Sequence, residues 1–279
     1  MLFQNAIGGE TTCTTGRSGG DASHRRQSGF TLVELLVVMV IIAILASIGI
    51  PALRGMAKGN RINSALVQLR DDLNLARLTA INSRSTVYVV FVPTNIAEID
   101  FEAKAESQLD PLSKELLVEQ LDSLVDGAFA SYAIVTERTV GDQPGRYRPR
   151  YVSEWKRLPE GVLIAPYKFL NPPSINAAFR EYNEGFDYVD AGSIPFPRTD
   201  LLRPGRKLPY IAFNSQGQLL SREDEVIALA EGSVLFPRDM AGNYLAPDVV
   251  ISPPNNFTNS MIRVNWLTGR PSLETPTIQ

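Results

Sequence analysis

FTLVELLVVMVIIAILASIGI, residues 30–50, is an apolar run of 21 residues in which Glu34 is the only charged side chain. As a helix rising about 1.5 Å per residue, the run would span roughly 31 Å, the thickness of a bilayer core. Arg25 and Arg26 precede the run, and the positive-inside rule then places the N-terminus in the cytoplasm. Basic residues also follow the run, so charge gives this orientation only partial support.

Two other interpretations of this run are a secretory signal peptide and a plain membrane anchor. A signal peptide usually has a shorter apolar run followed by a small-residue cleavage site, and Ser47-Ile48-Gly49 is a poor match to such a site. A plain anchor has no use for Glu34, because an intramembrane carboxylate costs about 2.5–3.5 kcal/mol at the centre of a span and less near its end. Glu34 is therefore a candidate functional residue that needs a cationic partner.

Residues 1–29 are rich in Gly, Ser and Thr and cannot form a core, so we expect a leader that is removed. The leader holds the single cysteine, Cys13, and the single histidine, His24. A mature chain without them has no disulfide, no Cys nucleophile, no His/Cys zinc site and no Ser-His-Asp triad. After the leader, residues 30–279 also lack a phosphate-binding GxxxxGK[ST] loop and a GxSxG elbow. We therefore predict a protein that is not an enzyme and needs no cofactor or metal.

The segment RRQSGFTLVELLVV, residues 25–38, resembles the prepilin cleavage and methylation motif of type IV pilin-like proteins. The resemblance implies that a membrane aspartyl peptidase cuts between Gly29 and Phe30 and that Phe30 is then N-methylated. It also implies that Glu34 pairs with the new amine of Phe30 on a neighbouring subunit during assembly. This implication is physically coherent, because cleavage creates a cation at the membrane depth of the carboxylate.

The helix is expected to continue to residue 83. Pro51 lacks an N–H and should kink the helix without ending it. Beyond it, apolar residues recur at steps of three and four (Ile62, Leu66, Leu69, Leu73, Ala76 and Ala80), which predicts one buried stripe. We therefore divide this helix into a transmembrane half, residues 30–50, and an amphipathic soluble half, residues 51–83.

Residues 84–279 are predicted to form a β-rich globular domain. Thr86–Val92 is β-branched and aromatic and predicts a buried strand. Further strands are expected at Ser131–Glu137, Gly161–Ala165, Pro209–Asn214, Val226–Leu229, Val249–Ser252 and Met261–Leu267, with turns at 214–217 and 268–270. Because no helices alternate with these strands, the fold class is α+β, a long N-terminal helix on an antiparallel sheet.

A second resemblance is to the H-class minor pseudopilins of type II secretion and the FimT-type minor pilins. It rests on residues 69–77 leading into the strand at 88–91, on residues 211–217, and on a terminal strand that ends at Thr268-Gly269-Arg270. The chain departs from these families by two long insertions, residues 94–126 and 166–208.

The two insertions differ in composition. Residues 94–126 hold nine acids and two lysines, and leucines after Pro111 predict an amphipathic helix there. A solvated acidic helix is favoured over a partner-binding or calcium-binding face. Residues 166–208 are rich in proline and aromatic residues and should either cover the sheet or bind a neighbouring subunit. The segment Asp239–Asp248 has oxygen ligands at short spacing but fits no defined calcium template, so a surface turn is favoured.

Two groups of basic residues could contact phosphates: Arg146, Arg148 and Arg150, and Arg198, Arg203, Arg206 and Lys207. The net charge of residues 51–279 is nevertheless −3, because the leader's +1 and the −1 of Glu34 cancel in the total, so DNA binding is disfavoured.

The sequence therefore predicts a minor pilin or pseudopilin subunit of a type II secretion or type IV pilus-like filament. Its partners would be the prepilin peptidase/methylase, other subunits and the inner membrane, which it would cross once with its C-terminal domain periplasmic or extracellular. The alternatives are a DNA-uptake minor pilin and a membrane-anchored protein of unrelated function.

Overall fold

The structure is a computed structural model of the 279-residue chain, which divides into two compact units, Met1–Ala52 and Leu53–Gln279. The structure describes residues 31–107, 110–139, 141–143, 148–169, 185–190, 193–198, 207–253 and 260–274, with the backbone alone at 48–60. Helix α1 (Leu32–Ser83) contributes to both units, so its C-terminal end lies where the sequence predicts. None of the helices in these ranges offers a described stretch long and apolar enough to cross a membrane.

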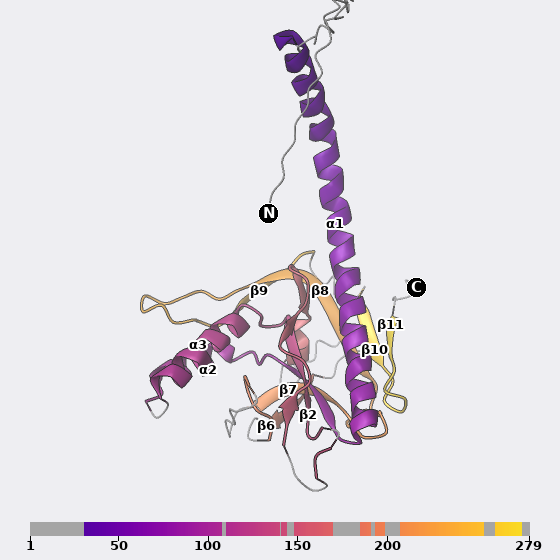
Figure 1. The fold of residues 1–279 in the computed structure, drawn as a ribbon, viewed down its shortest axis with the longest axis vertical. Helices are drawn as coiled ribbons and strands as arrows, with labels where there is room; N and C mark the ends of the chain where they lie inside the picture. The colour runs from indigo at the N-terminus through magenta and orange to yellow at the C-terminus, as the bar shows by residue number, and fades with distance from the viewer. Residues whose placement is uncertain are drawn as a thin grey trace, which may run out of the picture. The chain divides into compact units, whose positions relative to one another are not determined.

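The C-terminal half of α1 carries the predicted apolar stripe. Leu69, Leu73, Ala76 and Ala80 are fully buried, and Ile62 is partly buried against the same core. Because these residues recur at the helical period, one face of α1 lies on the sheets and the other faces solvent. Figure 1 shows this part of α1 alongside β10 (Met261–Val264) and β11 (Pro271–Glu274).

The first sheet is antiparallel, with β1 between β2 and β7, β3 and β6 at its two edges, and β4 also paired with β2. Its strands are β1 (Val87–Phe91), β2 (Ser131–Thr136), β3 (Arg150–Tyr151), β4 (Lys156–Arg157), β6 (Asp187–Asp190) and β7 (Lys207–Phe213). Strand β2 is buried along its whole length, as its β-branched and aromatic residues predict.

The second sheet is also antiparallel, in the order β11-β10-β8-β5, with β9 paired to the far end of β8. Its strands are β5 (Val162–Ile164), β8 (Glu225–Leu235), β9 (Asp248–Ile251), β10 (Met261–Val264) and β11 (Pro271–Glu274). Strand β8 is longer than predicted because it pairs with β10 and β5 along its first part and with β9 along its second. The α+β class with antiparallel sheets is confirmed.

The end of the chain differs from the prediction. The strand expected at Met261–Leu267 stops at Val264, and the chain turns and returns as β11. Asn265 causes the turn, because its Oδ1 accepts from the backbone N–H of Thr268 (3.0 Å) and from the Thr268 hydroxyl (3.1 Å). An asparagine side chain that bonds nearby backbone groups competes with the strand ladder. The predicted terminal strand is therefore a hairpin.

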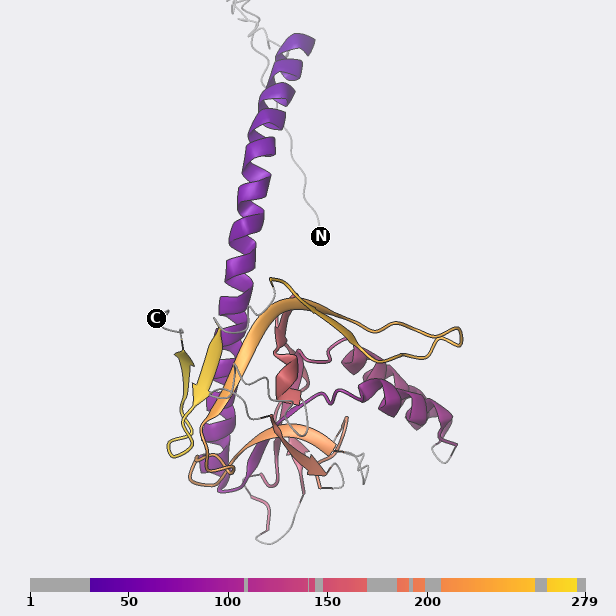
Figure 2. The ribbon, with the colours of Figure 1, turned by 180° about the vertical axis from the view of Figure 1, so that it is seen from behind.

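The first insertion contains two helices, α2 (Ile96–Ala105) and α3 (Pro111–Val125). The helix predicted after Pro111 is confirmed, and its start follows from its cap. Oδ1 of Asp110 accepts from the N–H of Leu112 (3.0 Å) and of Ser113 (3.4 Å), and Pro111 occupies the first turn. The prediction missed α2. Figure 2 shows both helices beside the long loop that joins β8 to β9.

The described part of the second insertion belongs to the core and covers the first sheet. It includes η1 (Pro166–Phe169) and β6. Phe169, Phe186 and Phe196 are buried, and the Phe186 ring stacks on Phe91 of β1 with centroids 4.3 Å apart. Of the two roles considered for this insertion, covering the sheet is the one that these contacts support.

Candidate functional site

The first turn of α1 holds the sequence's leading site residue, Glu34. Thr31 precedes the helix, and its Oγ1 accepts from the N–H of Glu34 at 3.2 Å while its carbonyl accepts from the N–H of Leu35 at 3.1 Å. A threonine cap with glutamate three residues later has the spacing of a capping box, and a carboxylate at a helix N-terminus is favoured by the helix dipole. Sequence reasoning missed this local role of Thr31 and Glu34, although the pattern was readable.

The surroundings of Glu34 are apolar and uncovered. Every large apolar side chain from Leu32 to Leu45 is exposed. No ion pair of Glu34 occurs among the residues that the structure describes. Gly29 and Phe30 lie outside the described residues, so the predicted cleavage, methylation and pairing remain predictions. An exposed apolar surface of this length needs an apolar environment or a packing partner.

A buried polar network fixes α1 on the first sheet. Asp72 is 7% exposed; its Oδ2 accepts from the Tyr132 hydroxyl (2.7 Å) and its Oδ1 from Lys156 Nζ (2.5 Å). Gln68 Nε2 donates to the Tyr132 hydroxyl (3.1 Å) and to the Arg157 carbonyl (3.0 Å). Burial, reinforced by Asp72, raises the pKa of Tyr132 well above its ordinary value, so it acts as a donor. No sequence pattern pointed to Asp72, because its partners are more than 50 residues away.

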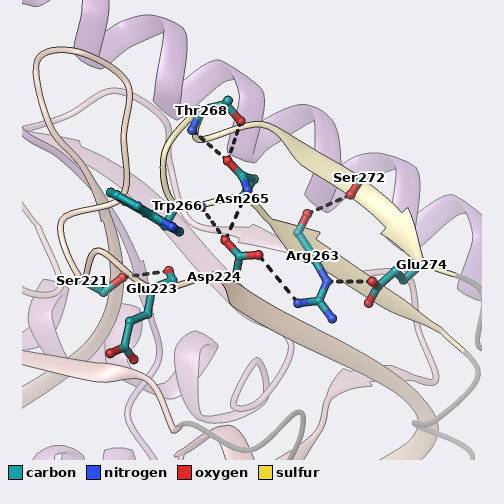
Figure 3. Close-up of polar contacts among 9 residues, drawn as sticks. All are labelled: Ser221, Glu223, Asp224, Arg263, Asn265, Trp266, Thr268, Ser272 and Glu274. Carbon is teal, nitrogen blue, oxygen red and sulfur yellow. Dashed lines mark hydrogen bonds and ion pairs between the residues drawn. The ribbon is translucent and has the colours of Figure 1, made fainter.

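The turn between β10 and β11 is tied both to α1 and to the loop before β8. Asp224 Oδ1 accepts from the N–H of Trp266 at 2.8 Å, and its Oδ2 lies 3.8 Å from Arg263 Nη1 (Figure 3). Arg263 Nε donates to Glu274 Oε1 at 2.6 Å, which holds β11 on β10. From α1, Arg77 Nε donates to the Thr268 carbonyl at 2.6 Å. These bonds give the turn one fixed position.

The acidic insertion carries a second charged cluster. Asp100 on α2 is 1% exposed, and its Oδ2 accepts from Lys104 Nζ at 2.6 Å, while Asp122 on α3 lies 3.4 Å from the same nitrogen. Lys104 Nζ also lies 5.4 Å from the ring centroid of Tyr244 in the β8–β9 loop. The insertion is thus partly solvated, as predicted, but its charges also hold α2, α3 and this loop together.

The segment suggested as a calcium loop is a surface turn. Asp239 Oδ1 accepts from the N–H of Ala241 (2.9 Å) and of Asn243 (2.8 Å), and its Oδ2 accepts from Asn243 Nδ2 (3.1 Å). The Asn243 side chain, with the backbone donors, holds the pKa of Asp239 below its usual value. Within the described ranges, no group of three or more His, Cys, Asp or Glu side chains is placed to hold a metal ion.

The basic groups do not form a described patch. Arg150 faces Asp142 at 3.7 Å, and Lys207 lies exposed at the start of β7. Arg146, Arg203 and Arg206 fall outside the described residues.

Comparison with known proteins links the chain to secretion pseudopilins. Residues 24–50 match the family described as the prokaryotic N-terminal methylation motif. Type II secretion system core protein G of Aeromonas hydrophila is 32% identical over 152 residues, covering 53% of this chain and 76% of that protein. Core protein G of Dickeya chrysanthemi is 43% identical over 64 residues, covering 22% of this chain and 40% of that protein. No solved structure matches the chain significantly.

The methylation motif identifies the chain as a prepilin with an N-terminal membrane anchor. Both relatives are named core protein G, so the finer resemblance to H-class and FimT-type subunits stays a prediction. The chain therefore belongs to the family of type II secretion system core protein G, as a pseudopilin with a structural and not an enzymatic role.

Proposed function

We propose that this protein is a minor subunit of a type II secretion or type IV pilus-like filament, cleaved between Gly29 and Phe30 and N-methylated at Phe30. The observation that carries the proposal is the methylation motif at residues 24–50 together with Glu34 in the first turn of an uncovered apolar helix. The motif and the helix start coincide, so cleavage would leave a free amine one turn from the carboxylate.

The proposed assembly step follows from the charge of the first turn. Residues 30–50 anchor the chain in the inner membrane, where a lone carboxylate must find a cation or stay protonated. The Phe30 amine is the cation that cleavage creates at that depth. The amine of a neighbouring subunit, displaced along the filament axis, pairs with Glu34 better than the chain's own amine, which the helix holds one turn away. Prepilin peptidase and other pseudopilins are then the required partners.

A minor and not a shaft position is supported by the insertions. Helices α2 and α3 and the long β8–β9 loop add bulk to the globular unit. A shaft subunit must repeat at close spacing, so bulky additions favour a position used a few times per filament. This argument also supports the H-class resemblance over the role of core protein G itself.

The processing step is tested by N-terminal sequencing of the protein purified from its native membrane. The mature chain should begin at Phe30 and carry a methyl group on its amine. A mature chain that retains Arg25 and Arg26 would contradict the proposal.

The pairing step is tested with Glu34→Gln and Glu34→Leu. Both remove the carboxylate, so both should reduce incorporation into sheared filaments or alter methylation of Phe30, while expression and membrane insertion persist. Thr31→Val, which removes the cap hydroxyl and keeps Glu34, separates helix capping from pairing. If both Glu34 variants assemble like the wild type in the native host, the pairing role is wrong.

A further inference from the structure

A groove lies between α2 and the loop that joins β8 to β9, and we name it the α2–hairpin groove. Its volume is about 640 Å³, and Phe101, Tyr244, Leu245 and Pro247 give it apolar walls. Phe101 is 52% exposed and Leu245 47%, so the groove leaves large apolar side chains uncovered. Glu98 also lines it, is exposed, and has no side-chain partner within the described part of the chain. The groove therefore suits an apolar group that carries positive charge beside it.

The two walls of the groove are held in place before anything binds. Lys104 connects Asp100 on α2 to the Tyr244 ring in the loop, and the guanidinium carbon of Arg238, in the same loop, lies 4.2 Å from the centroid of that ring. The loop is closed locally by the Asp239 turn. A preformed site loses little conformational entropy on binding, so modest apolar burial is enough to stabilise a contact.

The chain has a second uncovered apolar surface, which we name the turn patch. The turn patch consists of Leu220, Arg222, Trp266, Leu267 and Arg270. Leu220, Trp266 and Leu267 are 47%, 37% and 53% exposed, and the N–H of Leu219 donates to the Trp266 carbonyl at 2.9 Å, which joins the two loops.

Charge on the turn patch is complementary to charge in the groove. The guanidinium groups of Arg222 and Arg270 have no ion pair or hydrogen bond with any residue that the structure describes. Asp224 is held by the turn and Arg263, and the Glu223 carboxylate points away from the Trp266 ring (Figure 3). The two loops of the turn patch therefore carry two arginines along with their exposed apolar side chains.

The two surfaces lie on different sides of the globular unit. Figures 1 and 2 both show α2, α3 and the β8–β9 loop on one side of the sheets, and β10 and β11 on the other side next to α1. One copy therefore cannot fill its own groove with its own turn, whereas a second copy can.

We propose that the turn patch of one copy docks in the α2–hairpin groove of a second copy, with Trp266 and Leu267 against Phe101 and Leu245, and Arg222 and Arg270 facing Glu98. The contact joins two different surfaces and is head-to-tail, so it does not close into a two-fold dimer and can join the few copies that a minor position uses. This inference rests on the proposed filament role and names one lateral contact of the globular units. By itself the contact is small, and it becomes effective when membrane anchoring raises the local concentration of subunits.

The contact is tested by thiol cross-linking of the full chain in its native membrane. Cys13 is the only cysteine, so a Cys13→Ser background gives unique thiols. Two differently tagged chains, one with Leu245→Cys and one with Leu267→Cys, are co-expressed and treated with a bis-maleimide. A cross-linked heterodimer is expected from the mixture, at a yield at least about fivefold above the homodimer that either variant gives alone. Replacing Leu245→Cys by Leu112→Cys, an exposed leucine on α3 outside the groove, should abolish the product.

Charge reversal gives a second measurement on the same pair. Glu98→Arg in the groove copy, or Arg222→Glu with Arg270→Glu in the patch copy, should lower the heterodimer yield at least about fivefold. Combining the two reversals should restore it. Glu115→Arg, an exposed acid on α3 away from the groove, is the matched control and should leave the yield unchanged.

The outcomes separate this contact from the proposed function. Equal dimer yields from single variants, or no rescue by the paired reversals, would overturn the head-to-tail contact. A chain that begins at Phe30 and enters filaments without giving the heterodimer overturns the contact and leaves the filament role standing. A heterodimer that forms and is rescued supports the contact, and processing at Gly29 is read independently in the same samples.

Discussion

Gly217 and Gly269 lie where two turns meet α1. A Cβ on Gly269 would be 1.8 Å from the Gly217 carbonyl oxygen, and a Cβ on Gly217 would be 2.7 Å from Ile81 Cδ1. Both glycines also have positive φ, 78° and 61° in chain order. The position of Gly269 therefore requires glycine both for backbone conformation and for space, whereas at Gly217 the positive φ is the stronger reason, because the end of the Ile81 side chain can shift. Through this close approach, the β10–β11 turn and the loop after β7 pack on the last turns of α1.

We predict that Gly269→Ala destabilises the globular unit by at least about 3 kcal/mol, because it adds a backbone clash to left-handed strain. Gly242→Ala is the matched control: its φ is 85° but a Cβ there meets nothing within 4 Å. It should cost only the strain, about 1 kcal/mol. Urea unfolding of the two variants gives the comparison. Equal losses of unfolding free energy would show that the close approach does not contribute to stability.

Helix α2 carries a buried carboxylate, Asp100, which pairs with Lys104. Oδ1 of Asp100 is buried without a hydrogen-bond partner among the described residues. Burial raises the pKa of Asp100, and the bond to Lys104 opposes that rise without cancelling it. The charged form of Asp100 is thus less favoured than in water, and Lys104 beside it offsets part of that cost.

We predict that Asp100→Asn costs less stability than Lys104→Met, because the second variant leaves a buried carboxylate without its cation. The difference should be about 1–3 kcal/mol, and the double variant should recover most of it. A raised folded pKa means that stability is lost as pH rises from the ordinary value of 3.8 through the raised one. Asp100→Asn should remove that loss. Denaturant unfolding from pH 3 to pH 7 measures both effects, and identical pH profiles would contradict the assignment.

Helix α1 is held on the first sheet by hydrogen bonds as well as by its apolar stripe. We predict that Tyr132→Phe costs about 1–2 kcal/mol, because it removes the donor to the buried Asp72 carboxylate. Tyr88→Phe, which removes a bond to the partly exposed Glu137, should cost clearly less because water can replace that bond. Thermal unfolding of the two variants decides the point, and a larger loss from Tyr88→Phe would argue against this role of Asp72.

At the scale of the whole molecule, one core unites the soluble part of α1 with both sheets. A single cluster contains Leu69 and Leu73 of α1, Val89 of β1, Ile134 of β2 and Ile227 of β8. A shared core of this kind favours one all-or-none transition, because neither sheet can lose its cover without exposing the other.

We predict that a fragment starting at about residue 58 folds alone, is monomeric at micromolar concentration, and unfolds in one cooperative step. It keeps the buried part of α1 and both sheets and removes the apolar segment. Circular dichroism and tryptophan fluorescence should give coincident urea transitions. Two separated transitions, or none, would count against a single core.

The sequence by itself determined the class of the protein and which face of α1 is buried. The motif around Gly29 and Glu34 is contiguous, and the stripe from Leu66 to Ala80 follows the helical period, so both can be read without a partner. Alternating apolar residues and β-branched side chains located β1, β2, β5 and β7, because these patterns also involve only neighbouring residues. The leucines after Pro111 located α3, because their helical spacing is a local pattern.

Only the tertiary structure decided which charges are buried and which surfaces stay uncovered. The partners of Asp72 are 60 and 84 residues away, and Gly217 meets Gly269 across two loops. Strand β11 was not predicted because the turn at Asn265 interrupts an apolar pattern that otherwise reads as one strand. The α2–hairpin groove likewise combines α2 with a loop more than 130 residues later in the chain. Such contacts depend on long-range packing, which sequence periodicity does not encode, whereas motifs and helical stripes depend on neighbours within a few turns of the chain.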